Sequence, residues 1–552
     1  MRNKILYPIY LALAVSVGLG LGIMLNNTSP VMAISEVNER EAKLRKVLEL
    51  INYQYVDPVN TDSLLDQTIQ SMLKKLDPHS TYIPQNQVAA AEETMHGEFV
   101  GVGIEFKIFR DTLSIVRIIP GGPAEAAGLK AGQRILRADS VRLFGGEVTN
   151  KLVLNTLKGP RESSVPLLLY DPGQRELLNK TVQRGEVPVN SVSSRFLVND
   201  STGYLRLTRF TERSSKEVYT ALSHLLQQGA TQIILDLRDN PGGLLSEARQ
   251  IADQFLSEDK TIVVTKDRRG QKTTYRAQME GLFEKGDLAV LINGGSASAS
   301  EIVAGAVQDN DRGVIVGQRS FGKGLVQEEV TMSDGSKLRL TTQRYFTPTG
   351  RSIQKDFDHY NPHQLSGAQS QYQLNPKPHD SGEQAMADSL PTYRTPEGRV
   401  VKGGGGIYPQ VLSKIDSSMY SRRLYQLAMA VNLENRAFAF VDAQRARWAD
   451  YVLEAFITEF AVDDAVLKFF FRTLPPGALK DIPENERAVI KNRLKSLIAY
   501  QLYGSEGYRR THLPYDPYIQ DALQALGQPV PMRDVKASDA LAVEQEKAPA
   551  GS

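Results

Sequence analysis

The sequence predicts a multidomain α/β protein, with a mixed α/β core, an inserted β-rich module and helical regions at both ends. Three observations lead to this fold class. The chain has 552 residues, more than one hydrophobic core normally accommodates. Residues 187–354 alternate short apolar strands with amphipathic helices, and strands such as "IILDL" and "AVLI" are apolar throughout. Uninterrupted apolar strands are typical of a largely parallel sheet that is covered on both faces.

The N-terminus predicts export. Arg2 and Lys4 precede an apolar run over residues 5–25. A positively charged start followed by an apolar stretch is typical of a secretory signal, and this run is also long enough to remain as an inner-membrane anchor. We therefore interpret residues 1–33 as a signal peptide or membrane anchor, with "VMA" at 31–33 as the candidate cleavage site. The expected location is the bacterial periplasm or cell envelope.

Two further regions precede the core. Residues 35–96 predict an N-terminal helical region, because "VNEREAKLRKVLELINYQYV" and "TDSLLDQTIQSMLKKL" repeat apolar residues at helical spacing. Residues 97–186 change to the alternation of strands in "FVGVGIEFKIFRDTLSIVRII". This change predicts a small β-rich module between the helices and the α/β core at 187–354.

The chain after the core divides into three parts. Residues 355–402 are rich in Gln, Pro, Asn, His and Tyr, and we interpret them as a polar insertion or linker. Residues 403–530 begin with "GGGGIYP" and then predict a C-terminal helical domain, while residues 531–552 form a loose polar tail. Apolar runs such as "VLKFFFRTL" in the helical ends could support an oligomer, although core packing is the commoner use.

Composition excludes several classes of protein. The 65 basic and 63 acidic residues give a net charge of +2, which provides no electrostatic reason to expect a nucleic-acid partner. The chain has no cysteine, so it offers neither a thiol nucleophile nor a disulfide framework. Because the sequence also lacks a Cys/His cluster, we expect no metal and no cofactor.

The segment "LDLRDNPGG" (235–243) ends a predicted buried strand and leads into a helix. Glycines at such a junction let backbone N–H groups point into open space at the positive end of a helix, which suits an oxyanion. The alternative is an ordinary glycine-rich turn between a strand and a helix. Taken alone, the pattern favours the ordinary turn, because such turns are common in α/β sheets.

The segment "GGSASASE" (294–301) also joins a strand to a helix. It presents the hydroxyl of Ser298 at the start of the helix, as in a nucleophile elbow, although the G-x-S-x-G pattern is absent. Alternatively, Ser300 caps the helix and Glu301 supports its first turn. Capping explains one serine but not three, nor the glycine pair, so this segment alone leaves both interpretations open.

A nucleophilic serine needs a base. The seven histidines (79, 96, 224, 359, 363, 379 and 512) all lie outside the strand ends and glycine-bounded motifs of the core. Lys323 in "RSFGKGLVQ" lies between two glycines and near apolar residues, where loss of solvation would lower its pKa. Gln327, four residues later, could hold the amine by a hydrogen bond. The alternative is a solvated turn lysine.

Together these segments resemble the C-terminal processing peptidases, also called tail-specific proteases. The resemblance rests on "GGSASASEIVAGAVQDNDRGVIVGQRSFGKGLVQ", "ILDLRDNPGGLL", "LDPHSTYI" and "YFTPTGRSIQ", in the family's order over residues 40–355. It implies a Ser/Lys dyad with Ser298 as nucleophile, Lys323 as general base and Gln327 positioning the lysine. It also implies that the N–H groups of Gly243 and Ala299 form the oxyanion hole, and that no metal takes part.

The module at 97–186 resembles a PDZ domain. The resemblance implies that a glycine-rich turn binds the free carboxylate of a peptide, which adds as a strand; the residues of this turn are Gly101, Val102, Gly103 and Ile104. The chain departs from the family at Gln133 and Arg134, where an acidic residue is usual. This departure could alter the preference for tails.

The resemblance predicts a serine endopeptidase that recognises the apolar C-terminal tails of envelope proteins and cleaves them with the dyad. A second hypothesis is a catalytically inactive PDZ-containing scaffold. A third is a crotonase-like acyl-thioester enzyme, because similar glycine turns form oxyanion holes there. Export, the PDZ-like module and the serine–lysine pair disfavour this third hypothesis.

Overall fold

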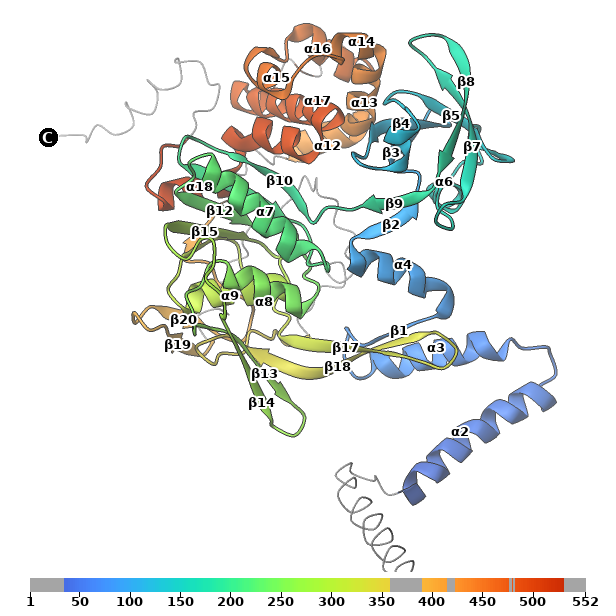
Figure 1. Ribbon diagram of the computed structural model, residues 1–552, viewed down its shortest axis with the longest axis vertical. Helices are drawn as coiled ribbons and strands as arrows, with labels where there is room; N and C mark the ends of the chain where they lie inside the picture. Colours follow the sequence, from blue (N-terminus) through green and yellow to red (C-terminus); the bar gives the residue numbers. More distant parts are fainter. Residues whose placement is uncertain (1–33, 358–389, 415–421, 476–478, 480–481, 531–552) are drawn as a thin grey trace, which may run out of the picture. The chain divides into compact units, whose positions relative to one another are not determined.

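The computed structural model describes residues 34–357, 390–414, 422–475, 479 and 482–530 (Figure 1). The predicted export signal at 1–33 and the tail at 531–552 therefore lie outside the described residues, as does most of the predicted insertion. The chain separates into two compact units, Met1–Pro84 and Gln85–Ser552. Each unit is described by itself.

The first unit is helical where it is described. It contains α2 (Ile34–Gln54), α3 (Thr61–Lys74) and the short strand β1 (Thr81–Ile83). Asn60 caps α3, because its side chain accepts a hydrogen bond from the N–H of Ser63 at 3.0 Å. Among the residues that the structure describes, no helix is long and apolar enough to cross a membrane; the apolar run at 5–25 was not among them.

The second unit is built on a central, mostly parallel sheet (Figure 1). Only its first two strands pair antiparallel, and every later pair is parallel. In spatial order, its strands are β10 (Val192–Leu197), β11 (Thr202–Leu207), β12 (Gln232–Asp236), β15 (Asp287–Ile292), β16 (Val314–Gly317) and β21 (Val411–Leu412). This sheet confirms the predicted mixed α/β core.

Helices cover both faces of the central sheet, which explains why its strands are apolar throughout. Alternate residues of β12 face opposite ways: Ile233 and Leu235 belong to one buried cluster, and Ile234 to another. The first cluster includes residues of α7 (Ser214–Gln227), α8 (Leu245–Asp253) and α9 (Ala299–Asp309). The second cluster includes residues of α18 (Pro517–Ala525), from the C-terminal end of the chain.

A second, antiparallel sheet accompanies the core. Its strands in the second unit are β17 (Leu325–Thr331), β18 (Lys337–Phe346), β13 (Thr261–Asp267) and β14 (Lys272–Arg276), in that order. A separate hairpin joins β19 (Thr392–Arg394) to β20 (Val400–Lys402).

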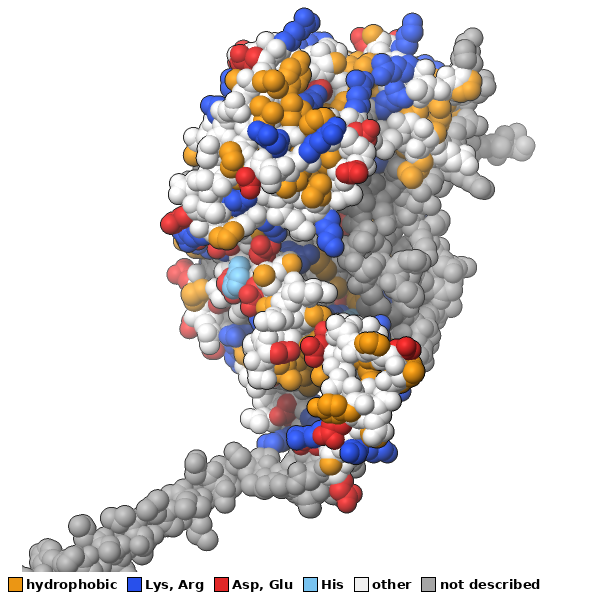
Figure 2. Space-filling view, turned by 90° about the vertical axis from the view of Figure 1, so that its right-hand side faces the viewer, with side chains coloured by type: hydrophobic (Ala, Val, Ile, Leu, Met, Phe, Trp, Pro, Cys, Tyr) orange, Lys and Arg blue, Asp and Glu red, His pale blue; other side chains and the backbone are white. Residues whose placement is uncertain are grey.

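Basic and acidic side chains both occur across the face shown in Figure 2.

The predicted β-rich module has its own hydrophobic core. It follows α4 (Gln85–His96) and is joined to the rest of the unit by the antiparallel pair β2 (Glu98–Gly101) and β9 (Gly185–Pro188). Its sheet contains β3 (Ile104–Phe109), β4 (Thr112–Ile118), β5 (Arg134–Ala138), β6 (Val141–Arg142), β7 (Ser164–Asp171) and β8 (Glu176–Gln183). Two helices, α5 (Pro123–Ala126) and α6 (Asn150–Leu157), complete it.

The C-terminal stretch is divided between a helical domain and the core. The helices α12 (Arg422–Val431), α13 (Leu433–Ala443), α14 (Arg445–Trp448), α15 (Leu453–Glu459), α16 (Asp464–Phe471) and most of α17 (Glu484–His512) share one aromatic-rich cluster. The stretch begins and ends in the core, however, because β21 extends the central sheet and α18 covers one of its faces. The 3₁₀ turn η3 (Leu513–Tyr515) connects α17 to α18.

Candidate active site

Ser298 lies between β15 and α9, at the start of the helix, and its side chain is half-buried. Its backbone adopts φ 54° and ψ −111°, in a region that residues other than glycine seldom occupy. Such strain persists only where the surroundings enforce it, and it is concentrated at functional sites. This strained junction between a strand and a helix agrees with the expected presentation of the hydroxyl.

Lys323 lies in the loop that connects β16 to β17. Its Nζ donates a hydrogen bond to Oε1 of Gln327 at 2.8 Å, as the sequence predicted. The neighbouring Gly322 has φ +92°, and a Cβ there would lie 2.8 Å from the Cβ of Lys355. A glycine at 322 therefore allows the loop to fold closely against the segment after β18.

Glu301 joins the two segments. Its Oε2 accepts hydrogen bonds from the N–H groups of both Ser298 and Lys323, each at 2.9 Å. Its Oε1 accepts a hydrogen bond from the N–H of Gly322 at 2.7 Å and one from the hydroxyl of Ser320 at 2.5 Å. One side chain thus joins the start of α9 to the loop that carries Lys323.

Tyr345 makes a second bridge between the same residues. Its hydroxyl lies 3.1 Å from the carbonyl oxygen of Ser298 and 2.7 Å from that of Lys323, and it donates to both. Tyr345 is on β18 and is 1% exposed. Folding therefore brings Ser298 and Lys323, which are far apart in sequence, into adjacent backbone positions.

The buried Glu301 carboxyl has an unusual pKa. Burial raises the pKa of Glu301 to about 7, although hydrogen bonds from Ser320 and from the N–H groups of Lys323, Gly322 and Ser298 favour the ionised form. The hydroxyl of Ser320 also accepts a hydrogen bond from the N–H of Ile407 at 2.6 Å. The "GGGGIYP" segment is thereby tied to the same carboxyl group.

The loop after β12 packs against the serine. A Cβ on Gly242, whose φ is +96°, would lie 2.9 Å from both Ser298 Cβ and Ala299 N. Gly243 pairs with Phe210 in an isolated parallel bridge. The N–H of Leu244 donates to the carbonyl of Phe210, and the N–H of Phe210 donates to the carbonyl of Gly242. Within the described part of the chain, no group accepts a hydrogen bond from the N–H of Gly243 or Ala299. Both N–H groups are therefore available to a ligand, that of Ala299 directly after the serine and that of Gly243 directly after the glycine that packs against it.

Ser300 has a different role from the one that its position suggested. In the alternative interpretation it caps α9, but the helix begins two residues earlier than that would require, and its N-cap is Ser298. The hydroxyl of Ser300 instead donates to the carbonyl of Asn240 at 2.9 Å, and the N–H of Ala297 donates to the same oxygen at 3.0 Å. The serine and alanine series thus lets two backbone segments approach closely.

The predicted carboxylate turn lies between β2 and β3. The carbonyl oxygens of Val102 and Gly103 accept hydrogen bonds from Ala124 and Ile119, and Gly103 has φ +80°. Over the residues that the structure covers, the N–H groups of Val102 and Gly103 have no acceptor. Gly101 ends β2 and Ile104 begins β3.

The unusual residues Gln133 and Arg134 do not lie in this turn. Gln133 is buried, accepts a hydrogen bond from the N–H of Lys130 at 3.0 Å and donates to Asp171 at 3.1 Å. Arg134 binds Asp442 of the helical domain through two hydrogen bonds of 2.5 and 3.2 Å. Both residues therefore serve packing around the module.

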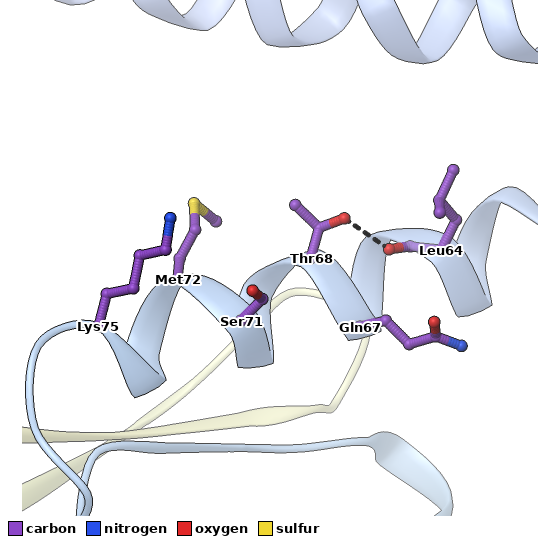
Figure 3. A pocket seen from close by; sticks show the side chains of 6 residues that line it. All are labelled: Leu64, Gln67, Thr68, Ser71, Met72 and Lys75. Atoms are coloured by element: carbon purple, nitrogen blue, oxygen red, sulfur yellow. Dashed lines mark hydrogen bonds between the residues drawn. The ribbon is translucent and has the colours of Figure 1, made fainter.

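A surface pocket of about 370 Å³ lies elsewhere, on α3 of the first unit (Figure 3). It contains a serine and a lysine four residues apart; its lining is Leu64, Gln67, Thr68, Ser71, Met72 and Lys75. The interior of a helix uses its N–H groups for its own hydrogen bonds, so the helical residues of this pocket offer no free backbone N–H groups for an oxyanion.

The chain is similar to several known proteases. The sequence model of peptidase family S41 matches residues 201–363, and that of the activating protease CtpB N-terminal domain matches residues 25–87. A carboxy-terminal-processing protease of Bartonella bacilliformis is 35% identical over 344 residues, which cover 60% of this chain and 78% of the relative. A carboxyl-terminal-processing protease of Synechocystis sp. is also 35% identical, over 62% of this chain and 84% of the relative.

The chain belongs to the carboxy-terminal processing proteases of peptidase family S41. It is also similar to the solved structure of the photosystem II D1 C-terminal processing protease, at 31% identity over 56% of this chain and 83% of that chain, with a TM-score of 0.32. Membership of this protease family confirms the resemblance seen in the sequence and excludes the crotonase-like alternative.

Sequence reasoning missed several residues around this S41 site. The pattern S-x-x-E at Ser298 and Glu301 is typical of a capping box, in which the glutamate accepts a hydrogen bond from the N–H of the N-cap serine. The pattern does not indicate the further hydrogen bonds that Glu301 accepts from the loop that carries Lys323. No local pattern marks Tyr345 or Ser320. Their roles follow from contacts between distant segments.

Proposed function

We propose that the protein is a serine endopeptidase in which Ser298 is the nucleophile and Lys323 the general base, with Gln327 holding the lysine. The observation that carries the proposal is the double bridge between Ser298 and Lys323, made by the Glu301 carboxylate and the Tyr345 hydroxyl. The half-buried positions of both residues also support it, since a nucleophile must be reached by substrate.

The proposed reaction is acyl transfer to serine followed by hydrolysis. Neutral Lys323 takes the proton of the Ser298 hydroxyl while Oγ attacks the scissile carbonyl carbon. The N–H groups of Gly243 and Ala299 stabilise the tetrahedral oxyanion, and each such donor typically contributes ~3 kcal/mol. The lysine then protonates the leaving amine, and water, deprotonated by the same lysine, hydrolyses the acyl-enzyme.

We further propose that residues 97–186 are a PDZ domain that delivers apolar C-terminal tails of envelope proteins. The N–H groups of Val102 and Gly103, with those of the neighbouring turn residues, would bind the terminal carboxylate. Residues 1–33 would export the protein or anchor it in the inner membrane, with residues 187–354 as the peptidase core. The substrates would then be proteins of the periplasm or envelope.

A cleavage assay tests both parts of the proposal. The purified protein from residue 34 onward is incubated with a peptide that ends in small apolar residues, and with the same peptide amidated at its C-terminus. We expect cleavage of the free acid, slower cleavage of the amide, and none by Ser298→Ala. Binding of the free acid without cleavage would instead support the inactive PDZ scaffold. Equal cleavage of acid and amide would contradict carboxylate recognition.

A further inference from the structure

The loop that carries Gly243 is held by a buried group of charges that includes the C-terminal end of the chain. Arg238, five residues before Gly243, donates two hydrogen bonds to Asp516, at 2.8 and 2.9 Å. It donates two more to Asp236, at 2.9 and 2.7 Å. The side chains of Arg238 and Asp516 are 7% and 5% exposed. This fork between two carboxylates fixes the guanidinium from both sides.

Asp516 is itself fixed by its surroundings. It is the N-cap of α18, and its Oδ1 accepts a hydrogen bond from the N–H of Tyr518 at 3.1 Å. The guanidinium carbon of Arg238 lies 4.7 Å from the centre of the Tyr518 ring, over its face. Beyond it, Ile519 and Leu523 are fully buried against the central sheet. The carboxylate therefore reaches Arg238 from a rigid element.

The same charges hold the backbone that leads to Gly243. Arg206 binds Asp236 at 2.8 Å and donates to the carbonyl of Arg238 at 3.0 Å. Two arginines and two aspartates thus balance in a site with almost no exposure. Arg206 also lies 3.7 Å from the partly exposed carboxylate of Asp239. Removal of the charge on Asp516 would leave Arg238 with Asp236 alone, which it shares with Arg206. A buried cation that loses one of its two carboxylates moves or becomes hydrated.

From these contacts we propose that Asp516 is a positioning residue of the peptidase site, which aligns the loop 239–243 through Arg238. The segment 513–518 is then an integral part of the active centre, although the match to the S41 family model ends at residue 363. The proposal rests on the proposed function only where it assigns Gly243 to the oxyanion hole.

The test compares Asp516→Asn and Asp516→Glu with the wild type, with Leu526→Ala as the matched control. Leu526 packs in the same cluster on the sheet, but none of its contacts that the structure describes reaches Arg238. For Asp516→Asn we expect kcat per folded molecule to fall at least ~10-fold with KM within about twofold, because an oxyanion donor acts mainly in the transition state. A peptide aldehyde that forms a tetrahedral adduct with Ser298 should lose affinity in parallel.

Asp516→Glu, which keeps the negative charge, and the control Leu526→Ala distinguish a positioning role of Asp516 from a general effect on stability. Asp516→Glu should recover part of the lost kcat, whereas Leu526→Ala should lower Tm without lowering kcat per folded molecule. Equal kcat losses in Asp516→Asn and Leu526→Ala, or a purely KM effect, would overturn the proposal. If Asp516→Asn does not fold, the Asp516→Glu variant gives the same comparison, with a smaller fall in kcat expected.

Hydrogen exchange measures the loop without reference to activity. Amides of 239–243 should exchange faster in Asp516→Asn than in Leu526→Ala, measured by mass spectrometry under conditions in which both are folded. Unchanged exchange in this loop would contradict the positioning role. If the wild type lacks Ser298-dependent cleavage but the exchange result holds, the proposed function fails while the link from Asp516 to the loop remains.

Discussion

At Glu301, burial and hydrogen bonding act on one carboxyl group in opposite directions. Its side chain has no exposure, and burial raises its pKa to about 7. Four donors, three N–H groups and one hydroxyl, are directed at its two oxygens and favour the ionised form. A proton would take up one of the acceptor positions that these four donors use, so protonation displaces or reverses at least one of the hydrogen bonds around Glu301.

This conflict predicts a pH dependence of stability. The folded pKa of about 7 exceeds the unfolded value of 4.5, so between these values the folded state binds the proton more strongly. The contribution of Glu301 to the free energy of unfolding therefore decreases as pH rises from 4.5 to 7, by about 3 kcal/mol in total. Denaturant unfolding of wild type and Glu301→Gln should show this slope only in the wild type. Parallel curves would contradict the prediction.

The base must be able to lose its proton. We expect Lys323→Arg to reduce kcat/KM by at least ~10³-fold, because a guanidinium stays protonated at any accessible pH. The long side chain and its hydrogen-bond donors are retained, so substrate binding measured by fluorescence anisotropy should change little. Activity within tenfold of wild type would exclude Lys323 as the base, whereas loss of binding as well would indicate a structural effect.

At the scale of elements, two turns that each connect a strand to a helix pack against one another. The turn after β12 supplies Gly242 and Gly243, and the turn after β15 supplies Ser298. Parallel neighbouring strands place both turns at the same edge of the sheet, because the carboxyl ends of parallel strands lie together. Small residues at both turns let them approach closely, which larger side chains would prevent.

Gly243 should tolerate no side chain. A Cβ there would lie 2.0 Å from the carbonyl oxygen of Phe210, at φ +149°. We expect Gly243→Ala to lower the free energy of unfolding by ~3 kcal/mol or more and to abolish cleavage. Gly350→Ala is the control, because Gly350 also has positive φ (+82°) but open space around its Cβ position. Chemical denaturation of both variants should show a cost of only ~1 kcal/mol at Gly350; equal costs would refute the steric explanation.

At the scale of the whole molecule, the helical domain contacts the β-rich module as well as the core. Besides the Arg134–Asp442 ion pair, the ring of Phe109 meets that of Phe438 edge to face at 5.0 Å, and Arg117 donates to the carbonyl of Tyr500. Tyr500 lies on α17, which leads through η3 to Asp516. The C-terminal part of the chain is therefore in contact with both the β-rich module and the loop 239–243.

The ion pair between Arg134 and Asp442 is expected to contribute to this contact. Their side chains are only 14% and 16% exposed, and the pairing is bidentate. A double-mutant cycle with Arg134→Ala and Asp442→Ala should give a coupling energy of ~1–3 kcal/mol in thermal or denaturant unfolding. Additive effects of the two substitutions would show that the pair contributes nothing.

Residues near one another in the sequence allowed much of the fold and part of the site to be predicted. Uninterrupted apolar strands indicated a sheet covered on both faces. The strand-to-helix turns at Gly243 and Ser298 left both an ordinary and a functional interpretation open, and only the family resemblance favoured the functional one. The alternative in which Ser300 caps the helix was wrong. Ser298 and Ser300 lie two residues apart and are both suitable caps, and the sequence does not show that the hydroxyl of Ser300 instead donates to the carbonyl of Asn240.

The sequence by itself determined the kinds of residue available: a serine and a glycine pair at strand ends, a lysine between glycines, and no cysteine. Only the tertiary structure decided which of them meet. Glu301 and Tyr345 join backbones that are separated along the chain, and Asp516 reaches Arg238 across 278 residues. Local patterns report backbone conformation and burial, whereas hydrogen bonds between distant segments depend on how the sheet and its covering helices pack.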